Sequence, residues 1–517
     1  MRALFSLFAL AVGLILVPFS GCAAPHGASR AGKRPNVLFL MADQLRGDFL
    51  GCSGNPAAST PNIDRLARDG ANFIRAYSST PSCTPARAAV LTGLSPWGHG
   101  MLGYHRVREQ YEFELPVLFR EAGWQTHQVG KNHFHPQRNP HGYEQIELDE
   151  SGRVRDEGFT SDYRQWFAQV APGVNPDATG IGWNDYRAGV YVLPEELHPT
   201  HWTADRAVTF LDQREDDRPF FMKVSFARPH SPYDPPARFL DRIDPKLVPA
   251  PFEGEWSDAQ FGSIVDPKAY TAARNALPEE VALRSRRHYL ASLAFVDEAI
   301  GRILDALERS GELDNTVILF TSDHGDMLGD HHLWRKTYAY EGSARIPMVL
   351  WWGSDVVELP RGQVRDEPVE LRDVLPTFLE VANLAIPASV EGASMLSLLR
   401  GVESWRQWID LEHATCYWPG NAWTALAGAK MKYIYHAYEG RESLFDIDAD
   451  PGETRDLARD LRYFGELALW RARMIEHLEP RGEPWVVAGA EGADGQSGLE
   501  LGVRKETILL RPRTASR

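Results

Sequence analysis

Four short apolar runs in this chain each end abruptly in acidic, basic or histidine side chains. The first, residues 37–41 (VLFLM), is apolar without a break, as is typical of a strand buried on both faces of a sheet. Asp43 and Gln44 come directly after it. The other three runs, in WQTHQVGKNHF, PFFMKVSFARPH and NTVILFTSDHG, end at residues 130–133, at His230 and at residues 322–325. A chain with this pattern is expected to form buried strands whose ends carry reactive side chains.

Between the third and fourth runs lies a long helical pattern. In RRHYLASLAFVDEAIGRILDALERSG the apolar positions share one helical face, and Gly311 follows as a stop signal. These positions are Leu290, Leu293, Ile300, Ile303, Leu304 and Leu307. Strands that alternate with helices predict an α/β fold with a large mixed, mostly parallel sheet sandwiched by helices. Ligands of such sheets bind outside the carboxyl ends of the strands, so the polar residues after the four runs are expected to converge.

The chain changes character near residue 400. The segments WIDLEHATCYW, AWTALAGAKMKYIYHAYEG and ESLFDIDADPGE indicate short strands joined by turns, and residues 456–478 indicate a helix. We therefore expect a main domain over residues 35–400 and a smaller α+β domain with a short antiparallel sheet over residues 401–490. Residues 491–517 are rich in glycine and charge and are expected to form a flexible tail.

The first 22 residues have the pattern of an export signal. Arg2 precedes an apolar stretch that closes with Ser20, Gly21 and Cys22, and this stretch is short for a transmembrane span. Two processing routes fit it: ordinary cleavage, and lipoprotein cleavage that leaves Cys22 as a lipidated first residue. A polar linker follows over residues 23–34. The sequence thus predicts an exported protein, periplasmic or at the cell surface, whose only membrane attachment would be a lipid at Cys22.

A net charge of −15 argues against a general binder of nucleic acid or membrane surfaces, since such proteins need a basic face. A local cluster of cationic side chains could still bind an anionic substrate, because distant charges are screened. Only four cysteines occur in 517 residues, so the fold is not expected to depend on disulfides. The sequence leaves open whether Cys52 and Cys416 pair.

One of the cysteines, Cys83, lies in PSCTPARAAVLTGL, where a helix is expected to begin. Pro85 suits the first helical turn, because its missing N–H would have no partner there. Cys83 is then near a helix N-terminus, where backbone N–H groups and the helix dipole favour an anion. Arg87 lies about one turn further along the same face. The segment indicates a nucleophile beside a site for a negatively charged substrate; taken alone, Cys83 could also be a buried thiol without function.

Residues 83–87 (CTPAR) match a Cys-x-Pro-x-Arg signature, and the chain thereby resembles the formylglycine-dependent sulfatases of the alkaline-phosphatase-like superfamily. The resemblance covers roughly residues 35–460, which makes residues 35–400 the expected catalytic domain. It implies that a separate maturation enzyme oxidises Cys83 to formylglycine. One hydroxyl of the hydrated aldehyde would attack the sulfur of a sulfate ester, and the other would later expel inorganic sulfate.

Further motifs occur in the order of that family. MADQ resembles its first metal motif and SDHGD its second, which together imply the metal ligands Asp43, Gln44, Cys83, Asp323 and His324. Gln44 and His324 are departures, because the family more often has Asp at the first place and many members have Asn at the second. GKNHF, PHSPY and HHLWRKTYAYEG imply the catalytic residues Lys131, His133, His230 and Lys336.

The chemistry of these residue types agrees with the resemblance. Carboxylate and amide oxygens suit Ca²⁺, which we expect here, with Mg²⁺ or Mn²⁺ as alternatives because His324 is a less natural calcium ligand. The cation would stabilise a sulfate oxygen and acidify the formylglycine hydrate. The remaining charge of the sulfate would be held by Arg87, Lys131 and Lys336. His230 would protonate the leaving alcohol, and His133 would act as the base that releases sulfate.

The smaller domain carries a candidate sugar-binding segment, EHATCYWPGNAW. Its aromatic and hydrogen-bonding side chains suit a sugar ring, which has both apolar faces and hydroxyl groups. The candidate substrate-binding residues are His413, Trp418, Asn421 and Trp423. The alternative is that the tryptophans are core residues at the domain junction.

The sequence therefore predicts an exported sulfatase, with a sulfated carbohydrate favoured over a small aryl sulfate as its substrate. The nearest alternative is a phosphonate or phosphate ester hydrolase of the same superfamily, because related enzymes share formylglycine and some share the Asp-Gln and Asp-His pairs. A non-catalytic protein that binds sulfated glycans is the other alternative, although binding alone would not need every acid, base and metal residue. The implied partners are the sulfate ester and the maturation enzyme, and not nucleic acid.

Overall fold

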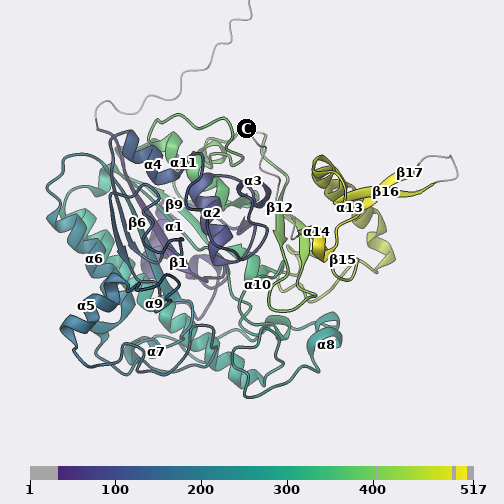
Figure 1. Ribbon diagram of the computed structural model, residues 1–517, viewed down its shortest axis with the longest axis horizontal. Helices are drawn as coiled ribbons and strands as arrows, with labels where there is room; N and C mark the ends of the chain where they lie inside the picture. Colours follow the sequence, from purple (N-terminus) through teal and green to yellow (C-terminus); the bar gives the residue numbers. More distant parts are fainter. Residues whose placement is uncertain (1–32, 403, 492–496, 509–517) are drawn as a thin grey trace, which may run out of the picture.

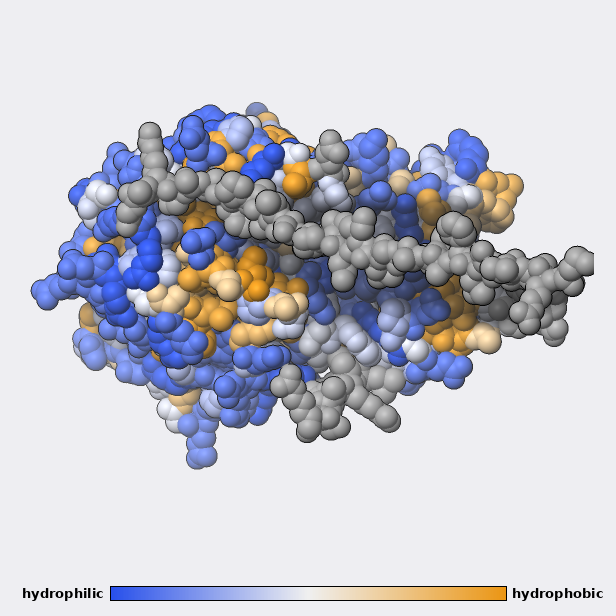
Figure 2. Space-filling view, turned by 90° about the horizontal axis from the view of Figure 1, so that it is seen from above, coloured by the Kyte–Doolittle hydropathy of each residue, from blue (hydrophilic) through white to orange (hydrophobic). Residues whose placement is uncertain are grey.

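A computed structural model describes residues 33–402, 404–491 and 497–508. The predicted signal peptide, Cys22 and most of the predicted linker lie outside this part. The described chain is mixed α/β, with a large helix-covered sheet beside a smaller antiparallel sheet (Figure 1). None of the described helices is both long and apolar enough to cross a membrane. The face seen in Figure 2 is largely hydrophilic, with hydrophobic residues in smaller groups.

The large sheet has eight strands in the order β10-β2-β9-β7-β1-β6-β4-β5. Neighbours from β7 to β5 run parallel, whereas β9 runs antiparallel to both β7 and β2. The bounds are β1 Asn36–Asp43, β2 Ala71–Phe73, β4 Gln125–Gly130, β5 Gln145–Leu148, β6 Phe220–Pro229, β7 Thr316–Thr321, β9 Met348–Trp352 and β10 Gln363–Arg365. The prediction of a large, mixed and mostly parallel sheet is confirmed.

The four apolar runs of the sequence form four adjacent strands, β7, β1, β6 and β4. Every residue of β1 is buried, in agreement with its unbroken apolar run. Leu40 of β1 lies in register with Val224 of β6 and Phe320 of β7. Because these strands are parallel and aligned, the polar residues that follow them meet at one edge of the sheet.

Alternate residues of β1 point to opposite faces of the sheet, and each face has its own layer of helices. Leu38 and Leu40 pack in a core cluster with α1 Pro61–Asp69, α6 Pro199–Gln213, α7 Ala237–Leu240 and α9 Glu279–Arg309. Phe39 and Met41 pack on the other face with α2 Cys83–Thr92, α4 Leu115–Glu121, α11 Val374–Val381 and α12 Leu396–Leu399. The sheet is therefore sandwiched by helices, as predicted.

The long helix α9 matches its predicted pattern. It ends at Arg309, and Gly311 follows in a left-handed conformation with φ 70°. The apolar residues predicted to share one face are all buried: Leu290, Leu293, Ile300, Ile303, Leu304 and Leu307.

Shorter elements border the main sheet. A second sheet contains β3 Ala76–Tyr77, β8 Arg345–Ile346 and β11 Val369–Glu370. The remaining helices of this region are α3 Pro96–His99, α5 Asp162–Val170, α8 Glu255–Phe261 and α10 Glu341–Ala344. Cys52 and Cys416, whose pairing the sequence left open, are both free thiols.

The smaller antiparallel sheet is also confirmed. Its strands are β12 Trp408–His413, β13 Trp423–Gly428, β14 Met431–His436 and β15 Arg441–Asp446, paired in this order. One face packs against α13 Phe464–Leu478. The other face packs against residues of the main domain, among them Tyr77, Leu333 and Tyr340. This second contact lies beside the loops that follow the strands of the main sheet.

The elements near the C-terminus differ in extent from the sequence pattern. The helix expected from residue 456 begins at Phe464, because the Asp460 side chain accepts a hydrogen bond from the Arg462 N–H and caps a separate short turn. The predicted flexible tail is structured where the chain is described. There β17 Ser497–Leu501 pairs with β16 Val486–Glu491, and α14 Lys505–Ile508 joins the core beneath α13.

Candidate active site

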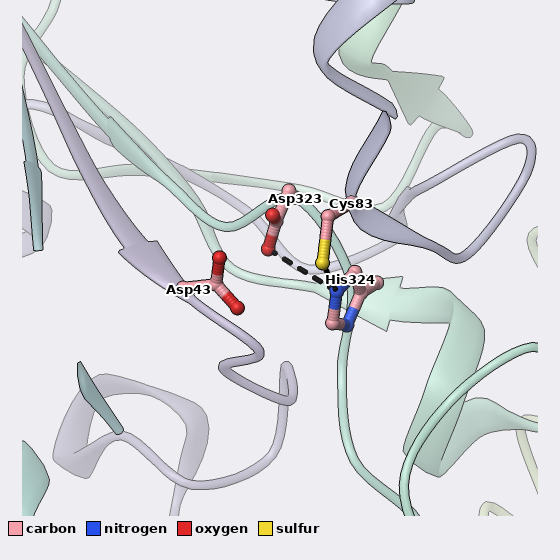
Figure 3. A group of neighbouring side chains, drawn as sticks. All are labelled: Asp43, Cys83, Asp323 and His324. Atoms are coloured by element: carbon pink, nitrogen blue, oxygen red, sulfur yellow. Dashed lines mark hydrogen bonds and ion pairs between the residues drawn. The ribbon is translucent and has the colours of Figure 1, made fainter. Parts of the chain in front are cut away.

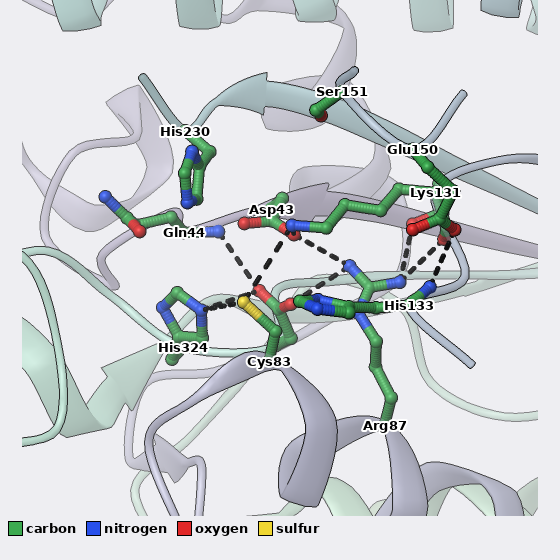
Figure 4. Close-up of polar contacts among 12 residues, drawn as sticks. Asp43, Gln44, Cys83, Arg87, Lys131, His133, Glu150, Ser151, His230 and His324 are labelled. Atoms are coloured by element: carbon green, nitrogen blue, oxygen red, sulfur yellow. Dashed lines mark hydrogen bonds and ion pairs between the residues drawn. The ribbon is translucent and has the colours of Figure 1, made fainter. Parts of the chain in front are cut away.

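The ends of the central strands bring the predicted catalytic residues together (Figure 4). Asp43 is the last residue of β1, Lys131 follows β4 and His230 follows β6. Asp323 and His324 come shortly after β7. These residues are far apart in the sequence and are all buried at the same sheet edge.

Cys83 is the first residue of α2 and points toward this edge. Pro85 lies in the first turn, so the helix begins as the sequence predicted. The sulfur of Cys83 lies 3.1 Å from Lys336 Nζ, 3.2 Å from His324 Nε2 and 3.8 Å from Lys131 Nζ. The thiol is buried among groups that carry or can carry positive charge.

The neighbouring charges decide the protonation of this thiol. Burial and the Asp43 carboxylate raise the pKa of Cys83, but Lys131, Lys336 and His324 outweigh them and lower it to about 6. Burial lowers the pKa of Lys131 more than its ion-pair partner Asp43 raises it. The site therefore stabilises negative charge at the position of the Cys83 side chain.

Four side chains form a candidate metal site (Figure 3). Asp43, Cys83, Asp323 and His324 each offer one ligand atom, and these atoms lie within 4.8 Å of one another. Oδ1 of Asp43 is buried and accepts no hydrogen bond from the described residues, which a cation would correct. His324 Nδ1 lies 2.9 Å from the Gly325 carbonyl, so Nδ1 carries the proton and Nε2 offers its lone pair. The donor set fits a divalent cation.

The side chain of Gln44 is connected to this cluster through Lys336, whose Nζ also lies 3.1 Å from the Cys83 sulfur. Its Oε1 accepts a hydrogen bond from Lys336 Nζ at 2.9 Å, and its Nε2 donates to Asp326 Oδ2 at 2.5 Å. Asp326 is buried and also accepts a hydrogen bond from the Tyr233 hydroxyl at 2.6 Å. These two contacts fix the orientation of the Gln44 amide. Asp326 was not among the sequence candidates, although it closes the motif SDHGD.

Arg87, which was expected to help hold sulfate, is engaged by carboxylates of the candidate metal site. Its Nε donates to Asp323 Oδ2 at 3.1 Å and its Nη2 to Asp43 Oδ2 at 2.9 Å, and Nη2 also forms an ion pair with Asp323 Oδ2 at 2.9 Å. Its Nη1 donates to the Lys131 carbonyl at 2.7 Å and to Ser225 Oγ at 3.1 Å. Each nitrogen of the guanidinium is thereby engaged. Arg87 orients the two carboxylates of the candidate metal site.

His230 reaches the site from the end of β6. Its backbone N–H donates to the Asp43 carbonyl at 3.0 Å, and its Nδ1 lies 2.9 Å from the Ser231 carbonyl. Nδ1 therefore carries the proton, and Nε2 faces Arg153 Nη2 at 3.5 Å. Burial, together with Lys336 and other nearby cations, lowers the pKa of His230 well below its usual value. This lowered pKa favours the neutral imidazole in the substrate-free protein.

His133 is held by residues that the sequence analysis missed. The Glu150 carboxylate accepts hydrogen bonds from the backbone N–H groups of Asn132 and His133, at 2.9 and 2.8 Å, where His133 has φ 59°. His133 Nε2 lies 3.0 Å from the Tyr104 hydroxyl. Burial and the charge of Lys131 lower the pKa of His133 well below its usual value. Glu150 follows β5 as the other site residues follow their strands, and that position was the available signal.

Three of the four candidate sugar-binding residues lie behind the active site, where their polar atoms are already paired. His413 Nε2 lies 3.1 Å from Ser82 Oγ, and His413 is fully buried. Asn421 Nδ2 donates to Thr337 Oγ1 at 2.7 Å, and Trp423 Nε1 donates to the Thr337 carbonyl at 2.9 Å. Their burial argues against direct sugar contact by these three residues.

Trp418, the fourth candidate, is half-buried, with the Arg274 guanidinium 4.5 Å from its ring centroid. His413 contacts Ser82, which directly precedes Cys83 in the chain. Asn421 and Trp423 contact Thr337, which directly follows Lys336. The smaller sheet thus supports two segments that carry catalytic candidates.

Comparisons with known proteins agree with this arrangement. The sulfatase family model matches residues 35–384, and the model for the C-terminal region of N-sulphoglucosamine sulphohydrolase matches residues 329–478. A choline-sulfatase of Rhizobium meliloti is 31% identical over 456 residues, which cover 83% of each chain. The crystal structure of a phosphonate monoester hydrolase of Agrobacterium radiobacter superposes with a TM-score of 0.73 at 24% identity, over 89% of this chain and 99% of that one. At this identity the likeness shows the fold.

An arylsulfatase of Clostridium perfringens is 37% identical over 464 residues, which cover 87% of this chain and 95% of the relative. The family model itself extends over most of the main sheet and all the strand ends described above. This chain therefore belongs to the sulfatase family and is an enzyme of that family.

Proposed function

We propose that this protein hydrolyses a sulfate ester of a carbohydrate, with Cys83 oxidised to formylglycine and one divalent cation in the site. The observation that carries the proposal is the position of the Cys83 sulfur, 3.1 Å from Lys336 Nζ and 3.8 Å from Lys131 Nζ. A nucleophile at this position would meet an anion held by two ammonium groups. The match to a C-terminal model named for N-sulphoglucosamine sulphohydrolase supports a sugar substrate.

Each group of site residues has its own role in the proposed reaction. Lys131 and Lys336 bind the sulfate oxygens, and Arg87 keeps the two carboxylates in place. The divalent cation, Ca²⁺ with Mg²⁺ or Mn²⁺ as alternatives, would be held by Asp43, Gln44, Asp323 and His324. When bound, it supplies positive charge to the sulfate oxygens. Hydrated formylglycine supplies the hydroxyl that attacks sulfur.

The two histidines serve proton transfer. His230 is positioned to hold a proton at Nε2 for the leaving alcohol oxygen. A bound sulfate ester adds negative charge beside it, which favours the protonated imidazole over the neutral form of the free protein. His133 Nδ1 is buried without a partner among the described residues and can accept a proton within the site.

The mass of the peptide that contains Cys83 tests this proposal. Protein made with a maturation enzyme should carry formylglycine there and should hydrolyse sulfated sugars, whereas Cys83→Ala should fold and lose nearly all turnover. An active preparation with an intact Cys83 thiol would contradict the mechanism. Phosphonate and phosphate esters are assayed beside the sulfate esters, and faster turnover of either would favour the alternative hydrolase.

The proposal extends to the location of the enzyme. The export signal over residues 1–22 supports a periplasmic or cell-surface protein, lipid-anchored if Cys22 is modified. Expression in a bacterial host with Cys22→Ser as control separates the two routes. A lipoprotein loses its membrane attachment in this variant, whereas an ordinarily cleaved protein is recovered in the same soluble fraction from both.

A further inference from the structure

Three arginines that surround the active site each lie over an aromatic ring. The guanidinium carbon of Arg153 is 5.5 Å from the ring centroid of Trp183. The corresponding distances are 5.4 Å for Arg155 over Tyr104 and 4.2 Å for Arg335 over Tyr417. We refer to Arg153, Arg155 and Arg335 as the arginine rim. Stacking on a ring holds a guanidinium in place while leaving its N–H edge free for a ligand.

Each member of the rim is directly connected to a catalytic candidate. Arg153 Nη2 lies 3.5 Å from His230 Nε2. Arg155 Nη2 donates to the Tyr104 hydroxyl, which in turn lies 3.0 Å from His133 Nε2. Arg335 immediately precedes Lys336 in the chain. Arg153 and Arg155 therefore lie beside the two catalytic histidines, and Arg335 is next to a catalytic lysine in the chain.

No carboxylate of the described residues forms an ion pair with any of the three. Some other arginines stacked on rings are neutralised by a carboxylate, for example Arg138 by Asp162 at 2.8 Å. Nη1 of Arg153 and Nε of Arg335 are buried and have no hydrogen-bond partner within the described chain. A buried, unpaired cationic donor is costly unless a ligand satisfies it. The charge is unexpected in a protein whose net charge is −15.

The scissile sulfate does not account for these cations, because Lys131 and Lys336 already lie at Cys83. Arg153 lies instead beside His230, the residue placed to protonate the leaving alcohol. A cationic side chain next to the leaving oxygen is close to the alcohol part of the substrate and not to the sulfate. Arg153 thus points to the alcohol part of the ester.

We propose that the arginine rim binds a second anionic group of the substrate, a carboxylate or a further sulfate on the sugar that leaves as the alcohol. This inference rests on the proposed function and specifies its substrate class. Arg153 and Arg155 form charge-assisted hydrogen bonds with that group on one side of the site, and Arg335 adds positive charge on the other.

The test uses matched pairs of substrates that differ only in the second charge. Hexose 6-sulfate is compared with hexose 3,6-disulfate, and hexose 2-sulfate with hexuronate 2-sulfate. We expect kcat/KM to be about ten- to a hundredfold higher for the doubly charged member, the scale of one charge-assisted hydrogen bond. The same sugars are measured as competitive inhibitors of 4-nitrophenyl sulfate hydrolysis, where the inhibition constants should show the same order.

In the variants Arg153→Gln and Arg155→Gln, the ratio of kcat/KM between the doubly and the singly charged sugar of each pair should be close to one. Arg138→Gln is the control, because this arginine is also stacked but is already paired with Asp162, and it should leave the ratio unchanged. Unfolding temperatures show whether each variant folds. The sulfate and carboxylate pairs reveal which anion the rim prefers.

The two proposals fail in different ways. An enzyme that hydrolyses sulfate esters but treats both members of every pair alike overturns the rim proposal and leaves the proposed function standing. A protein with formylglycine at residue 83 that hydrolyses no sulfate ester overturns both.

Discussion

Single buried carboxylates determine the orientation of the groups that contact the substrate or the cation. Asp326 is an example, because it accepts hydrogen bonds from Gln44 Nε2 and the Tyr233 hydroxyl on one oxygen. Its other oxygen accepts from the backbone N–H groups of Leu328 and Arg335. The carboxylate has no donor of its own, so the Gln44 amide has only one favourable orientation.

Asp326→Asn should reverse the Gln44 amide. The new NH₂ group would face Gln44, which would then turn its Nε2 toward Lys336 and the cation. We expect metal affinity to fall about ten- to a hundredfold, as for other residues that orient ligands. Calorimetric titration of Ca²⁺ and Mg²⁺ measures this. Tyr233→Phe removes the other donor to the same oxygen and serves as the control; equal affinity in Asp326→Asn and the unchanged protein would exclude Gln44 as a ligand.

Residue types at strand ends could be predicted from the sequence, but residues that act through another residue could not. Asp43 and Asp323 follow apolar runs, so both the motif and the strand pattern identified them. The carboxylate contacts of Arg87 could not be predicted, because helical spacing gives the direction of a side chain and not the partners that it meets. Asp326 and Glu150 orient an amide and two backbone N–H groups, and these contacts exist only in the folded chain.

The smaller sheet supports the catalytic segments with the side chains that were expected to bind sugar. His413 Nδ1 lies 2.6 Å from the Ala414 carbonyl and carries the proton, so Nε2 accepts a hydrogen bond from the Ser82 hydroxyl. Burial lowers the pKa of His413 to about 4, which keeps the acceptor neutral and available. The sequence showed that these side chains cluster in one turn. It could not show on which side of the strand the active site lies.

His413→Ala should lower kcat about tenfold with a smaller change in KM, because Cys83 follows Ser82 directly and small displacements of a nucleophile are costly. His413→Gln restores an acceptor and should recover most of the rate. His436→Ala is the matched control, since Trp423 pairs in register with both His413 and His436, and the His436 side chain lies 3.1 Å from Ser443 Oγ, away from the catalytic segments.

A double-mutant cycle separates this role from general stability. Ser82→Ala should cause the same loss as His413→Ala, and the double variant should lose no more than either. Additive losses, or a fall in unfolding temperature that equals that of His436→Ala without a change in kcat, would show that the contact only stabilises the fold.

At the scale of the whole molecule, two opposing charges act on an anionic substrate. The protein carries a net charge of −15, which repels an anion at long range. The arginine rim and the two active-site lysines attract it at short range. The range of each effect depends on salt, because the screening length is about 30 Å at 0.01 M and about 10 Å at 0.1 M ionic strength.

This contrast predicts a maximum in the salt dependence of kcat/KM. For a doubly charged sugar, kcat/KM should rise about two- to threefold from 0.01 to 0.1 M as the distant negative charges are screened. It should then fall toward 1 M, where the screening length is only about 3 Å and the charges of the rim are screened as well.

Choline sulfate, which has no net charge, serves as a control, and its kcat/KM should depend little on salt. Arg155→Gln should reduce the fall of kcat/KM above 0.1 M and leave the rise below 0.1 M unchanged. The substitution removes one charge near the substrate and hardly changes the net charge of the protein. A monotonic fall from the lowest salt would show that the substrate is guided by the rim alone and that the net charge of the molecule does not reach it.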